Sequence, residues 1–112
     1  MPDGFSVRIF NALRMIPSGR VSTYSDLAGY AATKKHARAA ASVLKKNPDP
    51  PHIPCHRIVR KDASLGGYSA PGGVRRKKEL LMKEGIQIRG GRVSDFEKVR
   101  YVFPSDRMRN ND

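Results

Sequence analysis

Cys55, the single cysteine of this 112-residue chain, lies in the run Pro54-Cys55-His56-Arg57, so a histidine follows it directly. A thiolate is a strong nucleophile, and a neighbouring imidazole can take up the thiol proton. Positively charged neighbours lower the pKa of a thiol. The candidates within six residues of Cys55 are His52, His56, Arg57, Arg60 and Lys61. The pattern predicts an activated nucleophile, and the alternative is an inert packing residue.

Irregular segments on both sides of Cys55 indicate a thiol presented by a loop. The run Asn47-Pro48-Asp49-Pro50-Pro51 must end any preceding helix, because proline lacks an N–H and constrains the residue before it. After Ile58-Val59, which predicts a buried strand, residues 65–73 hold four glycines. Such a loop can approach a ligand closely. It has no Walker or dinucleotide spacing, so we expect no nucleotide cofactor.

Three helices are expected before the proline-rich run. Apolar residues at helical spacing predict a first helix over residues 5–16, which Pro17 ends. Thr23 followed by Asp26 approximates a capping box for a second helix, and Tyr24 falls in its first turn.

The third helix, from about His36 to Lys46, is rich in alanine and carries basic residues. Two short helices joined by a tight turn, the second basic and with small side chains, are typical of a helix-turn-helix. A close-packed core helix with solvated lysines is the alternative.

The charge balance favours a polyanionic partner. The 22 Lys and Arg residues exceed the 10 Asp and Glu residues, which gives a formal net charge of +12. Nucleic acid is favoured over an anionic membrane, because no segment is both basic and strongly amphipathic. No apolar run approaches the ~20 residues that span a bilayer, and the N-terminus lacks a signal-peptide pattern. We expect a cytoplasmic monomer, associated with the nucleoid in a prokaryote or located in the nucleus of a eukaryote.

The second half of the chain predicts one further helix and a hairpin. The helix should span Val74 to Glu84 with Gly85 as its C-terminal cap, and it contains the basic run at residues 75–78. Residues 86–93 alternate in polarity around Gly90-Gly91, which predicts a β-hairpin. Residues 96–103 can pack, but strand and helix both remain open.

Together these elements predict a mainly α fold, a winged helix-turn-helix-like single domain with a short β element. It should span residues 1–103, and a disordered tail should follow over residues 104–112. With one cysteine and no convincing fourth ligand near His52 and His56, we expect no metal and no haem site.

The motif Pro-Cys-His-Arg-Ile-Val resembles the active-site motif of the O-6-alkylguanine-DNA alkyltransferases, the methylated-DNA–protein-cysteine methyltransferases. The resemblance extends in order over about residues 5–88. It includes the following segments: Gly19-Arg20-Val21-Ser22-Thr23-Tyr24, Ala37-Arg38-Ala39, Asn47-Pro48, Gly66-Gly67-Tyr68-Ser69 and Glu84-Gly85. It implies that duplex DNA with an alkylated guanine is the partner, and that a direct, single-turnover transfer repairs it without a cofactor.

The resemblance also implies a role for each matching residue. Cys55 would attack the alkyl carbon on guanine O6, His56 with Glu84 would take up the thiol proton through a water, and Tyr24 would assist the departing guanine. Arg38 would fill the space of the flipped-out base. Further DNA contacts would come from Ala37, Ala39, Ser22, Thr23 and Lys45. The substrate pocket would be lined by Tyr68, Ser69, Gly67 and Pro54, with Asn47 at the hinge and Arg57 in a structural role.

Two alternatives to transfer remain open. Family members usually carry an N-terminal domain, and the expected helix here begins almost at Met1. Such a short chain also resembles the alkyltransferase-like proteins, which bind alkylated guanine without transferring the group and signal to excision repair. Those proteins usually have tryptophan or alanine in place of Cys55, so the retained thiol favours transfer. A plain winged-helix regulator with an incidental cysteine is the second alternative.

Overall fold

The computed structural model describes residues 4–104 as a helix-rich domain with short strands. Its helices are α1 (Gly4–Met15), α2 (Tyr24–Ala31), α3 (Ala37–Leu44), α4 (Gly73–Lys83) and α5 (Phe96–Val99), with single 3₁₀ turns η1 (Lys34–His36) and η2 (Cys55–Arg57). Its strands are β1 (Ser22–Thr23), β2 (Ile58–Val59), β3 (Ile88–Arg89) and β4 (Arg92–Val93). The predicted fold class is confirmed. The predicted tail falls, apart from Pro104, outside the described residues.

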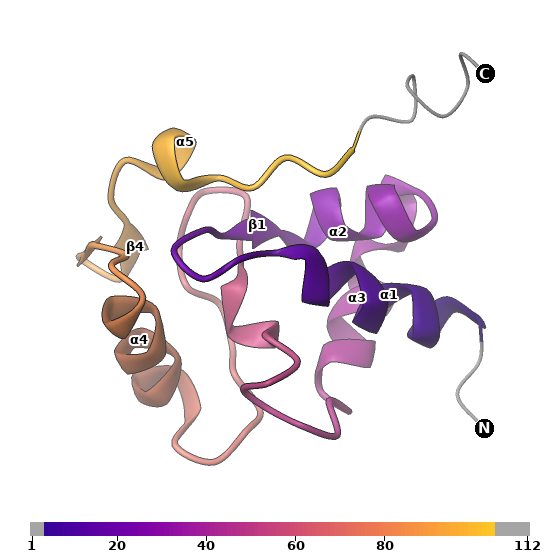
Figure 1. Ribbon diagram of the computed structural model, residues 1–112, viewed down its shortest axis with the longest axis horizontal. Helices are drawn as coiled ribbons and strands as arrows, with labels where there is room; N and C mark the ends of the chain where they lie inside the picture. The colour runs from indigo at the N-terminus through magenta and orange to yellow at the C-terminus, as the bar shows by residue number, and fades with distance from the viewer. Residues whose placement is uncertain (1–3, 105–112) are drawn as a thin grey trace.

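Helices α1, α2 and α3 group at one end of the molecule, and α4 with the hairpin lies at the other (Figure 1). The apolar stripe of α1 buries Ile9 and Leu13 completely against this three-helix group. Helix α2 begins as predicted, because the Oγ1 atom of Thr23 accepts a hydrogen bond of 3.0 Å from the backbone N–H of Asp26. The turn η1 then joins α2 to α3 in the predicted helix-turn-helix order.

A short parallel pair of strands connects the two ends of the molecule. Ser22 of β1 pairs with Ile58 of β2, and Thr23 pairs with Val59. Successive strand residues point to opposite faces, so Ile58 packs into the cluster of the first three helices and Val59 into a second cluster under α4. Strand β2 therefore holds the segment after Cys55 between two apolar cores.

Helix α4 ends with a glycine cap. Gly85 has φ +90°, its N–H donates to the carbonyl of Met82, and the N–H of Ile86 donates to the carbonyl of Leu81, each over 3.0 Å. This pair of bonds is the Schellman arrangement, which requires a left-handed residue and so favours glycine. The cap predicted at Gly85 is confirmed, and so is the hairpin, because β3 and β4 pair in antiparallel fashion around Gly90-Gly91.

The segment after the hairpin crosses from α4 back to α2 (Figure 1). The short helix α5 comes first, and an extended stretch then places Arg100 beside Val21 in a parallel bridge. The guanidinium of Arg100 contacts the carboxylate of Asp26 at 2.6 Å. The conformation that the sequence left open is thus helix followed by extended chain. Within residues 4–104, no helix is long and apolar enough to cross a membrane.

Candidate active site and nucleic-acid interface

A cavity of about 280 Å³ brings the predicted nucleophile together with residues from three other segments. Its lining comprises Tyr24, Ala41, Leu44, Lys45, Cys55, Gly67, Tyr68 and Ser69. Helix α2 supplies Tyr24, α3 and its C-terminal cap supply the next three, η2 supplies the cysteine and the glycine-rich loop the rest. The family resemblance implies different roles for these segments toward one substrate, and in the structure they line the same cavity.

Cys55 is the first residue of the turn η2, and its side chain is nearly buried, with 6% of the residue exposed. Burial raises the pKa of its thiol above the ordinary value, although a hydrogen bond with Asn47 and the positive charge of Lys77 oppose this effect. The expectation that neighbouring cations lower the pKa of Cys55 is therefore wrong in its net direction. One reason is that His52 lies in solvent beside Asp49, and another is that Arg57 is bound to Glu84. A buried thiol of this kind needs a base.

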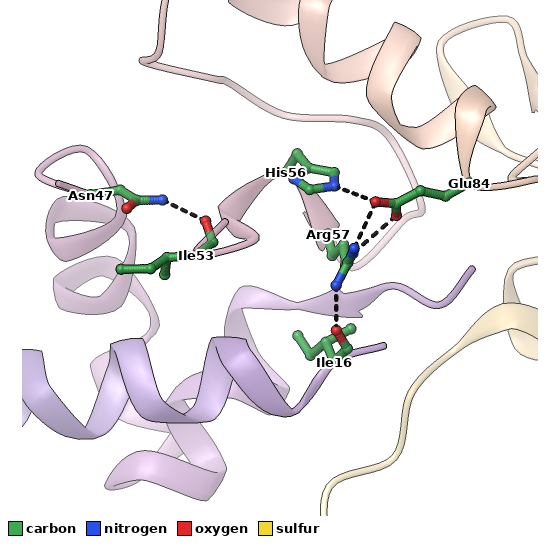
Figure 2. Close-up of polar contacts among 6 residues, drawn as sticks. All are labelled: Ile16, Asn47, Ile53, His56, Arg57 and Glu84. Atoms are coloured by element: carbon green, nitrogen blue, oxygen red, sulfur yellow. Dashed lines mark hydrogen bonds and ion pairs between the residues drawn. The ribbon is translucent and has the colours of Figure 1, made fainter. Parts of the chain in front are cut away.

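His56, Arg57 and Glu84 form a compact polar cluster behind the cysteine turn (Figure 2). The Nε2 atom of His56 lies 2.9 Å from Oε2 of Glu84. Arg57 donates to both oxygens of Glu84 over 2.9 and 2.7 Å, and also to the carbonyl of Ile16 over 2.7 Å. Arg57 thus has the structural hydrogen bonds predicted for it, and they fix the carboxylate against the imidazole.

The cluster sets the protonation of its members. Burial alone would raise the pKa of Glu84, but hydrogen bonds from Arg57 and His56 outweigh burial and lower it. Burial lowers the pKa of His56, against the opposing effect of Glu84. A carboxylate facing Nε2 requires the proton on that nitrogen, which leaves Nδ1 of the neutral ring as an acceptor. Nδ1 is buried without a hydrogen-bond partner in the described part of the chain.

Asn47 ties the segment after α3 to the segment that carries Cys55. Its Nδ2 atom donates to the carbonyl of Ile53 over 2.7 Å (Figure 2). Its Oδ1 atom accepts from the N–H of Asp49 over 2.9 Å. The predicted hinge position is therefore a bracing point for the proline-rich connector. Pro54, expected in the pocket, is buried just before η2 and does not line the cavity.

The two tyrosines of the cavity stay protonated. Burial raises the pKa of Tyr24, and burial together with the nearby Cys55 raises the pKa of Tyr68. A neutral phenol can donate a hydrogen bond to a ligand in the cavity. The hydroxyl of Tyr24 also lies close to the loop, because a Cβ added to Gly66 would sit 3.2 Å from it.

Helix α3 presents the basic surface that the sequence predicts. Arg38, Ala39 and Lys45 are exposed, and Ala37 is half-buried, while Ala40 and Leu44 point into the core. By contrast, Ser22 and Thr23 are 0% and 3% exposed. Thr23 caps α2 and Ser22 lies in the paired strand, so we correct the prediction that their side chains contact DNA.

Lys77 is a site residue that the sequence did not reveal. The side chain lies in the basic run of α4 but is 0% exposed, and burial lowers its pKa to about 8. A signal was present, because Leu80 and Leu81 follow at three- and four-residue spacing and so share its helix face. Among residues 4–104, no group of three or more His, Cys, Asp and Glu side chains could hold a metal ion.

Known proteins resemble this chain over most of its length. The profile of the family described as "6-O-methylguanine DNA methyltransferase, DNA binding domain" matches residues 4–86. A bifunctional methyltransferase/endonuclease of Thermoplasma volcanium is 42% identical over 93 residues, which are 83% of this chain and 29% of that protein. A methylated-DNA–protein-cysteine methyltransferase of Methanothermobacter thermautotrophicus is 43% identical over 83 residues, 74% of this chain and 45% of that protein. The chain thus spans less than half the length of these two relatives.

One solved structure is similar to this chain over nearly the whole length of both. The S. pombe protein Atl1, crystallised with damaged DNA containing O6-carboxymethylguanine, matches with a TM-score of 0.78 and 26% identity. The match covers 90% of this chain and 97% of that one. Because the family profile covers most of the chain, the protein belongs to the 6-O-methylguanine DNA methyltransferase family, through the DNA-binding domain of that family.

Proposed function

We propose that this protein repairs DNA by moving an alkyl group from O6 of guanine in duplex DNA to the sulfur of Cys55. The observation that carries the proposal is the shared cavity. It joins Cys55 to Tyr24 and to the loop residues Tyr68 and Ser69, directly beside the buried His56–Glu84 pair. A nucleophile and a hydrogen-bond donor in one cavity, with a proton acceptor on the residue next to the nucleophile, are the parts that an alkyl displacement needs.

The proposed step balances as a direct displacement. The Cys55 thiol gives its proton, through a water, to the unpaired Nδ1 of His56, and the anionic Glu84 stabilises the resulting imidazolium. The sulfur then forms a bond to the alkyl carbon, and the carbon–O6 bond breaks with its electron pair passing to guanine. Tyr24 donates a hydrogen bond to the departing base. The thioether has no route back to a thiol, so each molecule reacts once.

Helix α3 supplies the proposed DNA contact. A base inside a duplex cannot reach a cavity of this kind, so the nucleotide must be flipped out, at a cost of a few kcal/mol. Exposed Arg38 can fill the vacated stack, and the small neighbours Ala37 and Ala39 allow the helix to lie close to the DNA. Lys45 lies where α3 meets the cavity and can contact a flanking phosphate.

The test is the intact mass of the protein after mixing with a duplex that contains O6-methylguanine. Transfer predicts that the mass increases by one CH₂ unit, located on Cys55 by peptide mapping. The unmodified duplex and the Cys55→Ser variant are controls that should show no change, and the variant should still bind DNA. Tight binding without a mass change would contradict transfer.

Binding without transfer is the second candidate function. It is supported by the structural similarity to Atl1, which was crystallised with damaged DNA containing O6-carboxymethylguanine and matches this chain with a TM-score of 0.78. On this reading the cavity holds the alkylated base and the bound protein recruits excision repair. The same mass measurement, combined with a binding assay on damaged and undamaged duplexes, separates the two candidates. Equal affinity for both duplexes would instead indicate a DNA-binding regulator.

A further inference from the structure

Lys77 is a fully buried cation whose contacts are all to backbone carbonyls. Its Nζ atom donates to the carbonyl of Ile58 over 2.6 Å, to that of Gly67 over 3.1 Å, and to that of Leu65. Within residues 4–104 no carboxylate is paired with it. Burying a lysine is costly, so an arrangement that retains one points to a specific use of the charge.

The number of acceptors matches the charged form of the side chain. An ammonium group has three N–H donors, whereas a neutral amine has two. With three carbonyls directed at Nζ, the protonated lysine can donate to all three at once, whereas the neutral amine can donate to only two of them. The geometry therefore favours a positive charge at this position.

The three carbonyls belong to two segments that continue directly into the lining of the cavity. Ile58 directly follows the turn that carries Cys55, and Leu65 and Gly67 belong to the loop that continues to Tyr68 and Ser69. Lys77 thus links the nucleophile segment to the loop that lines the cavity through a single side chain. Loss of these bonds would free the loop to move relative to the thiol.

The same charge acts on the groups that exchange the proton. The positive charge of Lys77 lowers the pKa of Cys55 and adds to the effects that lower the pKa of His56. Of the other groups around the thiol, Tyr24 and Tyr68 are neutral, and Arg60 is a further cation that acts on Lys77 itself. The interaction with Cys55 is mutual, because the thiolate raises the pKa of Lys77.

We propose that Lys77 is a positioning residue for the transfer reaction, which holds the glycine-rich loop against strand β2 and supplies a positive charge that stabilises the Cys55 thiolate. This inference rests on the proposed function only for the identity of the substrate. The effect on the thiol exists whether or not an alkylguanine reacts.

The first experiment measures how fast iodoacetamide alkylates Cys55 as a function of pH. The test variant is Lys77→Met, which keeps an unbranched side chain of nearly the same length and removes the charge. The control is Lys78→Met, which removes an exposed charge from the same helix. We expect the midpoint of the pH profile to move upward only in the Lys77 variant. A shift of one unit makes alkylation at neutral pH about tenfold slower. Identical profiles for the two variants would overturn the electrostatic part of the proposal.

A second measurement does not depend on the folding of a variant. Side-chain ¹⁵N NMR of lysine-labelled wild-type protein follows the titration of Lys77 before and after methylation of Cys55 by iodomethane. Because the coupling is mutual, removal of the thiolate should lower the pKa of Lys77, and an unchanged titration would contradict the coupling. Iodoacetamide and iodomethane report on the thiol without DNA. A positive result here together with no transfer from O6-methylguanine would reject the proposed function and retain the role of Lys77.

Lys77→Arg separates position from charge. The guanidinium keeps the charge near Cys55 but cannot place its donors on the same three carbonyls. We expect its iodoacetamide profile to stay near that of the wild type while transfer from an O6-methylguanine duplex slows severalfold. Wild-type transfer rates in this variant would overturn the positioning part.

Discussion

The change Glu84→Gln tests the polar cluster behind the cysteine turn. Glu84 accepts two hydrogen bonds from Arg57 and one contact from His56 at 2.7 to 2.9 Å, and the side chains of Glu84 and Arg57 are only 14% and 16% exposed. The glutamine can keep an oxygen on the imidazole but not two on the guanidinium, so Arg57 becomes a poorly paired, half-buried cation. Removal of one partner from a buried pair costs about 3–5 kcal/mol, and the residual exposure favours the lower end, about 3 kcal/mol.

Urea unfolding monitored by circular dichroism measures this cost. With a slope of about 2 kcal/mol per M for a domain of this size, the midpoint should fall by about 1.5 M. The matched control is Glu79→Gln on the same helix. The Glu79 carboxylate is 56% exposed and lies 3.9 and 3.5 Å from Arg75 and Arg76, so its loss should cost less than about 0.5 kcal/mol. Equal midpoints for the two variants would refute the reasoning.

The pH dependence of the same difference has a defined sign. The pKa of Glu84 is lowered in the folded protein, because hydrogen bonds from Arg57 and His56 outweigh burial. A carboxyl with a depressed pKa stabilises the fold above its unfolded value of about 4.3, and this contribution is lost as the pH falls through the folded value. The gap between wild type and Glu84→Gln should therefore be full at pH 7 and shrink in acid. A gap that grows in acid would contradict the assignment.

Two further substitutions test the DNA surface and the cavity wall. Arg38→Ala should weaken binding to a lesion duplex about tenfold and flatten the salt dependence of binding, both measured by fluorescence anisotropy. The control Lys98→Ala, on the distant α5, should change neither. Equal effects of the two substitutions would count against the role of Arg38. Gly66 has φ +71°, and a Cβ there lies 3.2 Å from the hydroxyl of Tyr24, so Gly66→Ala should cost about 1–2 kcal/mol in urea unfolding. The control Gly67→Ala meets no atom within 4 Å and should be tolerated.

Local chemistry made the helices and their ends predictable. The spacing of Ile9, Leu13 and their neighbours predicts α1 because burial of one stripe needs that period. Thr23 and Gly85 mark helix ends because each satisfies backbone groups that no helix can satisfy alone. These signals lie within a few residues of what they specify. Contacts with distant residues do not change the helices and helix ends that these local signals predict.

Features that depend on distant contacts were not predictable from the sequence. Burial of Cys55 and Lys77 results from how two apolar clusters meet at strand β2, and only that burial determines the net pKa of the thiol. The sequence places five basic or imidazole side chains near Cys55, but it does not indicate which of them face solvent and so have little effect on the pKa of the thiol. The extended conformation at Arg100 depends on its bridge to Val21, which directly precedes β1. Strand β1 is only two residues long, so the sequence carries little local signal for either segment.

The pairing of β1 with β2 has a consequence for the nascent chain. Tyr24 directly follows β1, and Cys55 shortly precedes β2. Both therefore reach the cavity only after the chain between the two strands has folded and brought the strands together. Closure of so long a segment is a late and costly event compared with the formation of single helices. A partly folded chain therefore lacks the environment of the thiol. Under the proposed function, the irreversible reaction of Cys55 would then occur only in molecules in which α3 is already in place, and newly synthesised protein would be protected from futile modification.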